Sequence, residues 1–155
     1  MRFTLLSISL IAAFGLQAQA ADFSQQANKI AQSTLIIDTH IDVPYRLHDD
    51  WEDVTKATKR GEFDYPRARQ GGLNAPFMSI YIPSGNQAIP GASKALADSL
   101  ILMTERLAAT FPEKFAMAYS PADIEANFAK GLISLPMGME NGSGLEDDLG
   151  NVEYF

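Results

Sequence analysis

The segment "LIIDTHIDVP", from Leu35 to Pro44, joins an apolar run to a group of polar side chains. A short apolar run such as Thr34 to Asp38 predicts a strand that is buried on both faces, as the strands of parallel sheets are. His40 and Asp42 follow this run directly. We therefore expect the first strand of an α/β fold, with polar side chains at its carboxyl end.

The rest of the chain alternates between predicted strands and helices. Two further apolar runs are typical of strands, namely Asn74 to Pro83 and Leu132 to Met137. Residues at helical spacing predict helices over positions 22–32, 92–111 and 121–130. Phe115 to Tyr119 fits a short strand or a turn, residues 47–70 fit loop or surface helix, and a last helix is expected from Leu145 to Phe155. This alternation predicts a parallel sheet with right-handed crossovers.

The helix over residues 92–111 has the clearest pattern. Its apolar residues step by three or four positions and predict one buried face, formed by Leu96, Leu100, Met103, Leu107 and Phe111. Pro112 is expected to end this helix. In the next helix, Ser120 is the expected N-cap, Pro121 takes the first helical position, and Gly131 closes the C-terminus.

Composition restricts the class of protein. The 155 residues, 46% of them hydrophobic, are enough for one domain with a sizeable core. The net charge of −7 argues against binding to nucleic acid or to an anionic membrane, because both require a basic face. The chain has no cysteine, which excludes disulfides, thiolate zinc sites, a cysteine nucleophile and a lipoprotein anchor.

Residues 1–20 have the layout of a cleavable signal peptide. Arg2 supplies a positive start, Phe3 to Leu16 is mostly apolar, and Ala18 to Ala20 forms an A-x-A cleavage site. The alternative is an uncleaved membrane anchor, but the apolar run is shorter than the ~20 residues that a span requires. We expect export, to a bacterial periplasm or beyond the cell, of a mature chain over residues 21–155 with no stable membrane anchor.

His40 and Asp42 form the first candidate metal site. Side chains two positions apart in a strand point the same way, so these two would meet at the carboxyl end of the first strand. Sites in parallel α/β folds are built at that end, and imidazole nitrogen and carboxylate oxygen are zinc ligands. The alternative is a polar strand end whose side chains only make hydrogen bonds.

Glu140 is the third candidate ligand. It follows the apolar run "LISLPMGM", and glycines at 138, 142 and 144 let backbone approach a ligand closely. A carboxylate at the end of a neighbouring strand faces the same mouth of the sheet, and its two oxygens could bridge two metal ions. The alternative is an acidic residue that stabilises the N-terminus of the following helix.

The remaining polar residues are less suited to a site. His48 is the only other histidine and shares no strand or helix register with His40, so we expect it to be solvated or to support the site indirectly. The neighbouring acidic residues are expected to form a solvated face: Asp49, Asp50, Glu52 and Asp53. Nucleotide-binding and α/β-hydrolase motifs are absent from the sequence.

Three blocks resemble the membrane (renal) dipeptidase family. "IDTHIDVPYRL" is similar to its D-G-H-N-D-L-P strand end, and "FDYPRARQGGLNAPFMSIYIPS" is similar to a block with Asp-x-Pro-Arg, Gly-Gly and Ser-x-Tyr. "LISLPMGMENG" is similar to its G-x-E-G block. The blocks follow the family's order and spacing and cover most of Thr34 to Gly144. Thr39, Ile41 and Asn141 depart from the family's residues without removing a ligand.

The resemblance implies a zinc metallopeptidase on a TIM-type (β/α)₈ barrel. This chain would hold only the first few β/α units of an incomplete barrel, as the N-terminal part of a single domain. His40 and Asp42 would bind one zinc ion, and Glu140 would bridge two. A metal-activated water would then hydrolyse a small dipeptide substrate, and members of the family can form homodimers.

The resemblance also implies ligands that the chain lacks. The family takes two more histidines and a proton-shuttling acid from later strands, and no histidine follows His48. We expect an N-terminal fragment that is inactive alone and folds poorly. Two alternatives stay open: another metal-dependent amidohydrolase, or a non-catalytic exported binding protein on a degraded barrel.

Overall fold

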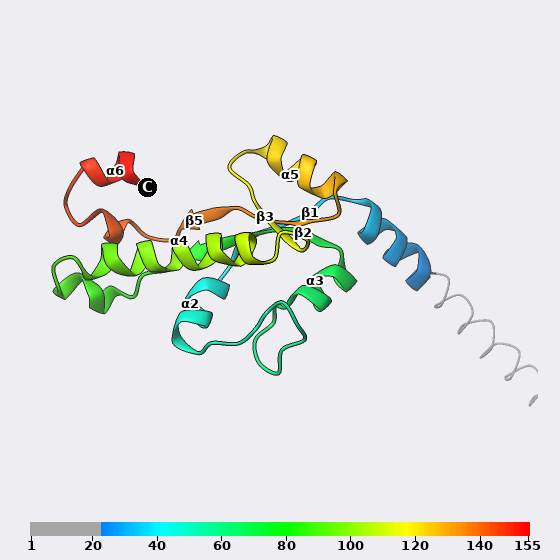
Figure 1. Cartoon of the computed structure of the whole chain (residues 1–155), viewed down its shortest axis with the longest axis horizontal. Coiled ribbons are helices and arrows are strands. Elements are labelled where there is room, and N and C mark those ends of the chain that lie inside the picture. Colours follow the sequence, from blue (N-terminus) through cyan, green and yellow to red (C-terminus); the bar gives the residue numbers. More distant parts are fainter. Residues whose placement is uncertain (1–22) are drawn as a thin grey trace, which may run out of the picture. The chain divides into compact units, whose positions relative to one another are not determined.

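The computed structural model describes residues 23–155 (Figure 1). The chain divides into two compact units, Met1–Thr34 and Leu35–Phe155. The described part of the first unit is a helix over residues 23–33, as the sequence predicts. The expected signal peptide lies outside the described residues. Among those residues, no helix is both long and apolar enough to cross a membrane.

The second unit contains two small parallel sheets. Strands β1 (Ile36–Ile41), β2 (Leu73–Ile80) and β5 (Met137–Met139) pair in the order β1-β2-β5, and β3 (Phe115–Met117) pairs with β4 (Ile133–Leu135). Parallel pairing with helices between the strands confirms the predicted α/β class. The closed eight-stranded barrel stays a prediction, because the described residues hold five short strands.

Pro136 divides the predicted strand at residues 132–137 into β4 and β5. Proline has no N–H to donate, so it cannot sit within a fully paired strand. Its carbonyl still accepts a hydrogen bond from the Met78 N–H at 2.8 Å, and the chain then continues along β2. The strand therefore extends to Met139, and the residue that follows it is Glu140.

Five α-helices connect or follow these strands. They are α2 (Val43–Asp49), α3 (Tyr65–Gly71), α4 (Ala92–Thr110), α5 (Pro121–Ala129) and α6 (Gly150–Tyr154), with short 3₁₀ turns at Ser84–Ala88 and Gly142–Leu145. The predicted caps of α5 are confirmed. The Ser120 side chain accepts from the Asp123 N–H, Pro121 is the first helical residue, and Gly131 follows with φ +73°.

Small side chains form the most buried stripe of α4. The sequence predicts a face of large apolar residues, but of these only Leu100 is fully buried. The other buried positions are Ser93, Ala97, Thr104 and Ala108, and Leu96, Met103 and Leu107 flank them. Short side chains let the helix lie close against β2 and β3, which rotates the buried face by about one residue from the predicted one.

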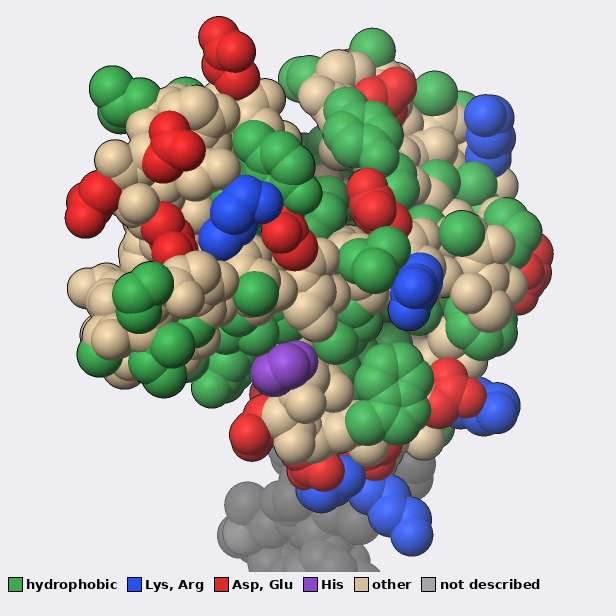
Figure 2. All heavy atoms as spheres, turned by 60° about the vertical axis from the view of Figure 1, so that its left-hand side comes forward, with side chains coloured by type: hydrophobic (Ala, Val, Ile, Leu, Met, Phe, Trp, Pro, Cys, Tyr) green, Lys and Arg blue, Asp and Glu red, His purple; other side chains and the backbone are tan. Residues whose placement is uncertain are grey.

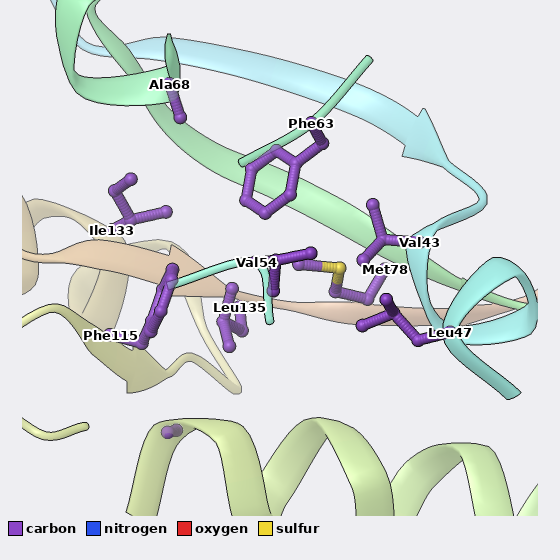
Figure 3. Packing of buried hydrophobic residues seen from close by; sticks show 10 residues of the cluster. Val43, Leu47, Val54, Phe63, Ala68, Met78, Phe115, Ile133 and Leu135 are labelled. Carbon is purple, nitrogen blue, oxygen red and sulfur yellow. The ribbon is translucent and has the colours of Figure 1, made fainter. Parts of the chain in front are cut away.

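The main core packs residues of the strands against residues of α2, α3 and α4 and of the loop that carries Val54 and Phe63 (Figure 3). Phe115 and Leu135 meet Val54 and Phe63 there, and Met78 joins them to α2. In a smaller cluster, Ile80 at the end of β2 and Ile82 just after it pack against α4. Helices α2 and α4 are thereby fixed relative to the carboxyl ends of β1 and β2.

Strand β1 differs from its prediction. It was expected to be buried on both faces, but residues 37–40 are exposed, and Ile37 keeps 44% of its surface accessible. Its single partner is β2, whereas β2 itself is buried along almost its whole length. A continuous apolar run therefore marks an edge strand here, with a face that the described residues do not cover.

The last predicted helix is also shorter than expected. Only Gly150–Tyr154 is helical, because Glu146 and Asp147 have φ angles of +49° and +58°, which no α-helix accommodates. The Glu146 carboxylate instead accepts hydrogen bonds from the Gly91 and Lys94 N–H groups at the start of α4. The turn at Glu146 and Asp147 therefore lets the Glu146 side chain cap the N-terminus of α4.

Large apolar side chains stay exposed on the second unit. They include Trp51, Leu102, Tyr119, Leu149, Val152 and Tyr154, each at least 44% accessible. Figure 2 shows hydrophobic side chains lying between acidic and basic ones over one face of the molecule.

Candidate metal centre

A β-bulge sets the direction of His40. Asp38 pairs with Pro76 and Ile41 with Met78, so three steps along β1 oppose two steps along β2. Bulges of this kind re-aim side chains and occur beside active sites. The His40 N–H, which lies within the bulge, donates to Asp38 Oδ1 at 3.0 Å. Asp38 therefore fills the place of the missing ladder partner.

Asp42 lies just beyond β1 at the N-cap of α2 and not within the strand. Its backbone carbonyl accepts from the Arg46 N–H at 3.1 Å, while its side chain makes no capping bond. Pro44 explains this in part, because it removes one of the N–H groups that an N-cap side chain binds. The free carboxylate turns to the site, where Oδ1 lies 3.2 Å from His40 Nε2.

Glu140 reaches the same point from β5. Its N–H donates to the Ile80 carbonyl at 3.3 Å, which continues the pairing of β2 with β5 by one residue. Its Oε2 lies 3.3 Å from His40 Nε2 and accepts a 2.9 Å hydrogen bond from Ser79 Oγ. The parallel register thus brings together residues that are 100 positions apart in the chain.

These three side chains are the one group among residues 23–155 that could hold a metal ion. A ligand atom from each lies within 4.8 Å of the others. One imidazole nitrogen and two carboxylate oxygens suit a divalent cation such as zinc, and the two negative charges favour it. The side chains keep 51%, 64% and 36% of their surface accessible, so the group is open to ligands.

Two hollows border the group. One, of about 400 Å³, is lined by Asp38, His40, Asp42, Arg46, Glu62 and Phe63, among others. The second, of about 290 Å³, lies over Ser79, Gly138 and Glu140. A Cβ built at Gly138 meets no atom within 4 Å, so this glycine leaves open space at the site.

His48 lies outside the group, as expected. It is exposed near the end of α2, and its ring centre is 6.3 Å from that of Tyr45. The face that residues 49–53 were expected to form is not simply solvated. Glu52 accepts hydrogen bonds from the Lys59 N–H and from the Arg46 guanidinium, and these bonds lower the pKa of Glu52. Hydrogen bonds from Lys56 and Thr55 lower the pKa of Asp53 to about 2.

Sequence reasoning missed the roles of Ser79 and Asp38. Ser79 is the one strongly polar side chain in the apolar run "APFMSIYI", which is the signal that could have revealed it. From the sequence, Asp38 is only the last residue of the apolar run. Its contact with the His40 N–H depends on the bulge, and a bulge cannot be read from the sequence without the pairing register.

A family model described as membrane dipeptidase, peptidase family M19, matches residues 24–155. Among curated proteins, the dipeptidase ataJ of Aspergillus terreus is 28% identical over 116 residues, which are 68% of this chain and 28% of the relative. The chain thus spans less than a third of that relative's length.

Solved structures with a similar fold come from proteins described as peptidases. The probable dipeptidase PvdM of Pseudomonas aeruginosa superposes with a TM-score of 0.73 at 23% identity, over 84% of this chain and 34% of that one. A metallopeptidase from Rhodobacter sphaeroides, bound to a phosphinate mimic of the dipeptide L-Ala-D-Ala, gives 0.68 at 21% identity, over 78% and 42%. At these identities the likeness shows the fold.

Proposed function

Because the chain belongs to the membrane dipeptidase family, we propose that the protein is a zinc-dependent dipeptidase whose metal is held by His40, Asp42 and Glu140. The observation that carries this proposal is the meeting of three ligand atoms within 4.8 Å at the carboxyl ends of β1 and β5, which are parallel strands of one sheet. Active sites of (β/α)₈ enzymes lie at that end of their strands. The proposal includes the complete barrel and two zinc ions.

Each ligand has a distinct part in this arrangement. His40 Nε2 lies at similar distances from Asp42 Oδ1 and Glu140 Oε2, so one cation can contact all three atoms after a small adjustment. Glu140 has a second oxygen, through which it can bridge to a second cation. A bound zinc ion lowers the pKa of its water to about 7 and polarises a substrate carbonyl. The two hollows offer space for the residues on either side of a scissile peptide bond.

We propose further that residues 21–155 alone do not hydrolyse dipeptides. The one remaining histidine of the sequence, His48, lies outside the metal group, and three side chains shared between two zinc ions hold neither firmly. The exposed apolar side chains of the second unit favour poor folding of the isolated segment. Zinc-dependent hydrolysis by purified residues 21–155 at rates comparable with full-length relatives would contradict this proposal.

Metal analysis tests the ligand assignment. The protein as its gene encodes it is purified, and its zinc content is measured by inductively coupled plasma mass spectrometry. His40→Ala and Asp42→Ala should each lose most of the metal, while the matched control His48→Ala should retain it. Unchanged zinc content in both ligand variants would refute the metal centre. If both ligand variants lose zinc but the parent protein has no peptidase activity, the result would favour a non-catalytic binding protein.

We also propose that the protein is exported after cleavage between Ala20 and Ala21. The support is the sequence layout of residues 1–20. N-terminal sequencing of the protein recovered from its host should begin at or near Ala21, and a sequence that begins at Met1 would rule out cleavage. A homodimer is a further expectation from the family, which the mass of the purified protein in solution tests.

A further inference from the structure

We propose that Ser79 is a positioning residue that fixes Glu140 for metal binding. This inference rests on the proposed function, because it concerns the same three-residue centre. It adds a residue that neither binds the metal nor touches the substrate in the scheme above.

The sheet register places Ser79 and Glu140 on one face. Ser79 of β2 pairs with Gly138 of β5, and Glu140 lies two residues further along the chain. Side chains two positions apart along a strand point to the same side, so the Glu140 side chain projects on the face that carries Ser79. The hydroxyl donates to Oε2 at 2.9 Å, which is an ordinary length for a strong O–H···O⁻ contact.

Burial makes this contact important to both partners. Ser79 is only 2% accessible, and a buried hydroxyl without a partner is destabilising because water cannot replace the lost hydrogen bond. Glu140 is 36% accessible at its side chain, so water alone would not hold the carboxylate in one orientation. The hydroxyl is a fixed donor on a rigid central strand, and the oxygen that accepts it is also the one 3.3 Å from His40 Nε2.

The consequence is a carboxylate that is oriented before a cation arrives. Without Ser79, the terminal torsions of Glu140 are free to rotate and Oε2 can leave the vicinity of His40. Partners that orient a metal ligand typically change metal affinity by about 10- to 100-fold when they are removed. A purely structural serine in the same strand would change stability and leave the affinity for the metal unaltered.

The chain offers a matched control. Ser93, at the start of α4, is 1% accessible, and its Oγ has no hydrogen-bond partner among residues 23–155. Ser79→Ala and Ser93→Ala therefore remove the same atom from equally buried sites, but only the first removes a contact with the metal group. Both changes shorten a side chain, so neither introduces a clash that would prevent folding.

The experiment measures zinc affinity of the protein as its gene encodes it, after removal of metal, by competition with a chelating indicator. Ser79→Ala should weaken zinc binding by about 10- to 100-fold, and Ser93→Ala should leave it within about twofold of the parent. In a Glu140→Ala background, adding Ser79→Ala should have no further effect, because the partner is already absent. Urea unfolding of the metal-free variants separates affinity from stability.

Three outcomes would overturn the inference. Unchanged affinity in Ser79→Ala, alongside strong losses in His40→Ala and Glu140→Ala, refutes the role of Ser79 and leaves the metal centre standing. Equal losses in Ser79→Ala and Ser93→Ala show a general effect of packing. Unchanged affinity in His40→Ala and Glu140→Ala removes the proposed centre itself, and the role of Ser79 with it.

Discussion

The Asp64 carboxylate is the best test of how the second sequence block stabilises the chain. It is 1% accessible and caps α3 by accepting from the Arg67 N–H at 2.9 Å. Its other oxygen accepts from the Thr58 N–H at 2.9 Å, from Arg67 Nε at 2.8 Å and from the Thr58 hydroxyl at 3.3 Å. Four donors therefore converge on one buried carboxylate.

We predict that Asp64→Ala lowers the free energy of unfolding by about 3 kcal/mol. Removing one member of a buried, hydrogen-bonded ion pair typically costs about 3–5 kcal/mol. We take the lower end because the Arg67 side chain is 42% accessible and can regain water. The change is large against a total stability of about 5–15 kcal/mol for a domain.

Asp64→Asn distinguishes charge and geometry from side-chain size. The amide oxygen can still cap α3, but the amide NH₂ would replace the oxygen that now faces the Thr58 N–H and Arg67 Nε. Donors would then face donors, so the asparagine variant should be almost as unstable as the alanine variant. Ser120→Ala, which removes an exposed N-cap, is the control and should cost about 1 kcal/mol.

Urea unfolding followed by circular dichroism at 222 nm measures these differences. The pH dependence provides a second signature. Burial raises the pKa of Asp64, but hydrogen bonds from Thr58 and Arg67 outweigh this and the pKa lies below its ordinary value. Its contribution is therefore present above the unfolded-state pKa of about 4 and is lost as pH falls through the folded-state pKa. A free energy of unfolding for Asp64→Asn within 1 kcal/mol of the parent value would refute this role of Asp64.

Three further predictions concern other local contacts. Gly61→Ala should destabilise by about 1–3 kcal/mol, because φ is +67° and a Cβ would lie 2.6 Å from the Arg46 guanidinium, whereas Gly71→Ala meets nothing within 4 Å; urea unfolding compares the two. NMR titration should give Asp53 a pKa of about 2, so that its contribution to stability is lost between about pH 4 and pH 2, and Lys56→Ala should raise this pKa. Glu146→Ala should destabilise the start of α4 and speed amide exchange there; unchanged exchange would contradict this.

The sequence predicts those parts of the fold that depend on local pattern. The alternation of elements and the caps of α5 are confirmed, because capping and strand propensity act within a few residues. The parallel pairing is confirmed because helices between successive strands return the chain to the same end of the sheet. Features that depend on neighbours differ. The exposed face of β1, the stripe of small residues on α4 and the turn at Glu146 are each set by what packs against them.

The candidate site divides in the same way. Residue types and spacing mark His40, Asp42 and Glu140 as candidate ligands, and the family resemblance joins them into one predicted centre. The geometry that joins them is less visible in the sequence. Asp42 reaches the site from a helix N-cap, His40 is turned by a bulge, and Ser79 meets Glu140 only through the β2–β5 register.

The second sequence block links stability to the site. Asp64 fixes Thr58 and the start of α3, and the segment held there includes Glu62 and Phe63, which line the hollow beside His40. Arg46 ties this segment to α2 by donating to the carbonyls of residues 60 and 63. Helix α2 begins directly after Asp42. If the segment around Glu62 and Phe63 becomes less ordered, both the wall of the hollow and the backbone that carries Asp42 therefore change. Variants at Asp64 should therefore weaken metal binding beyond their effect on folding, although they lie outside the metal group.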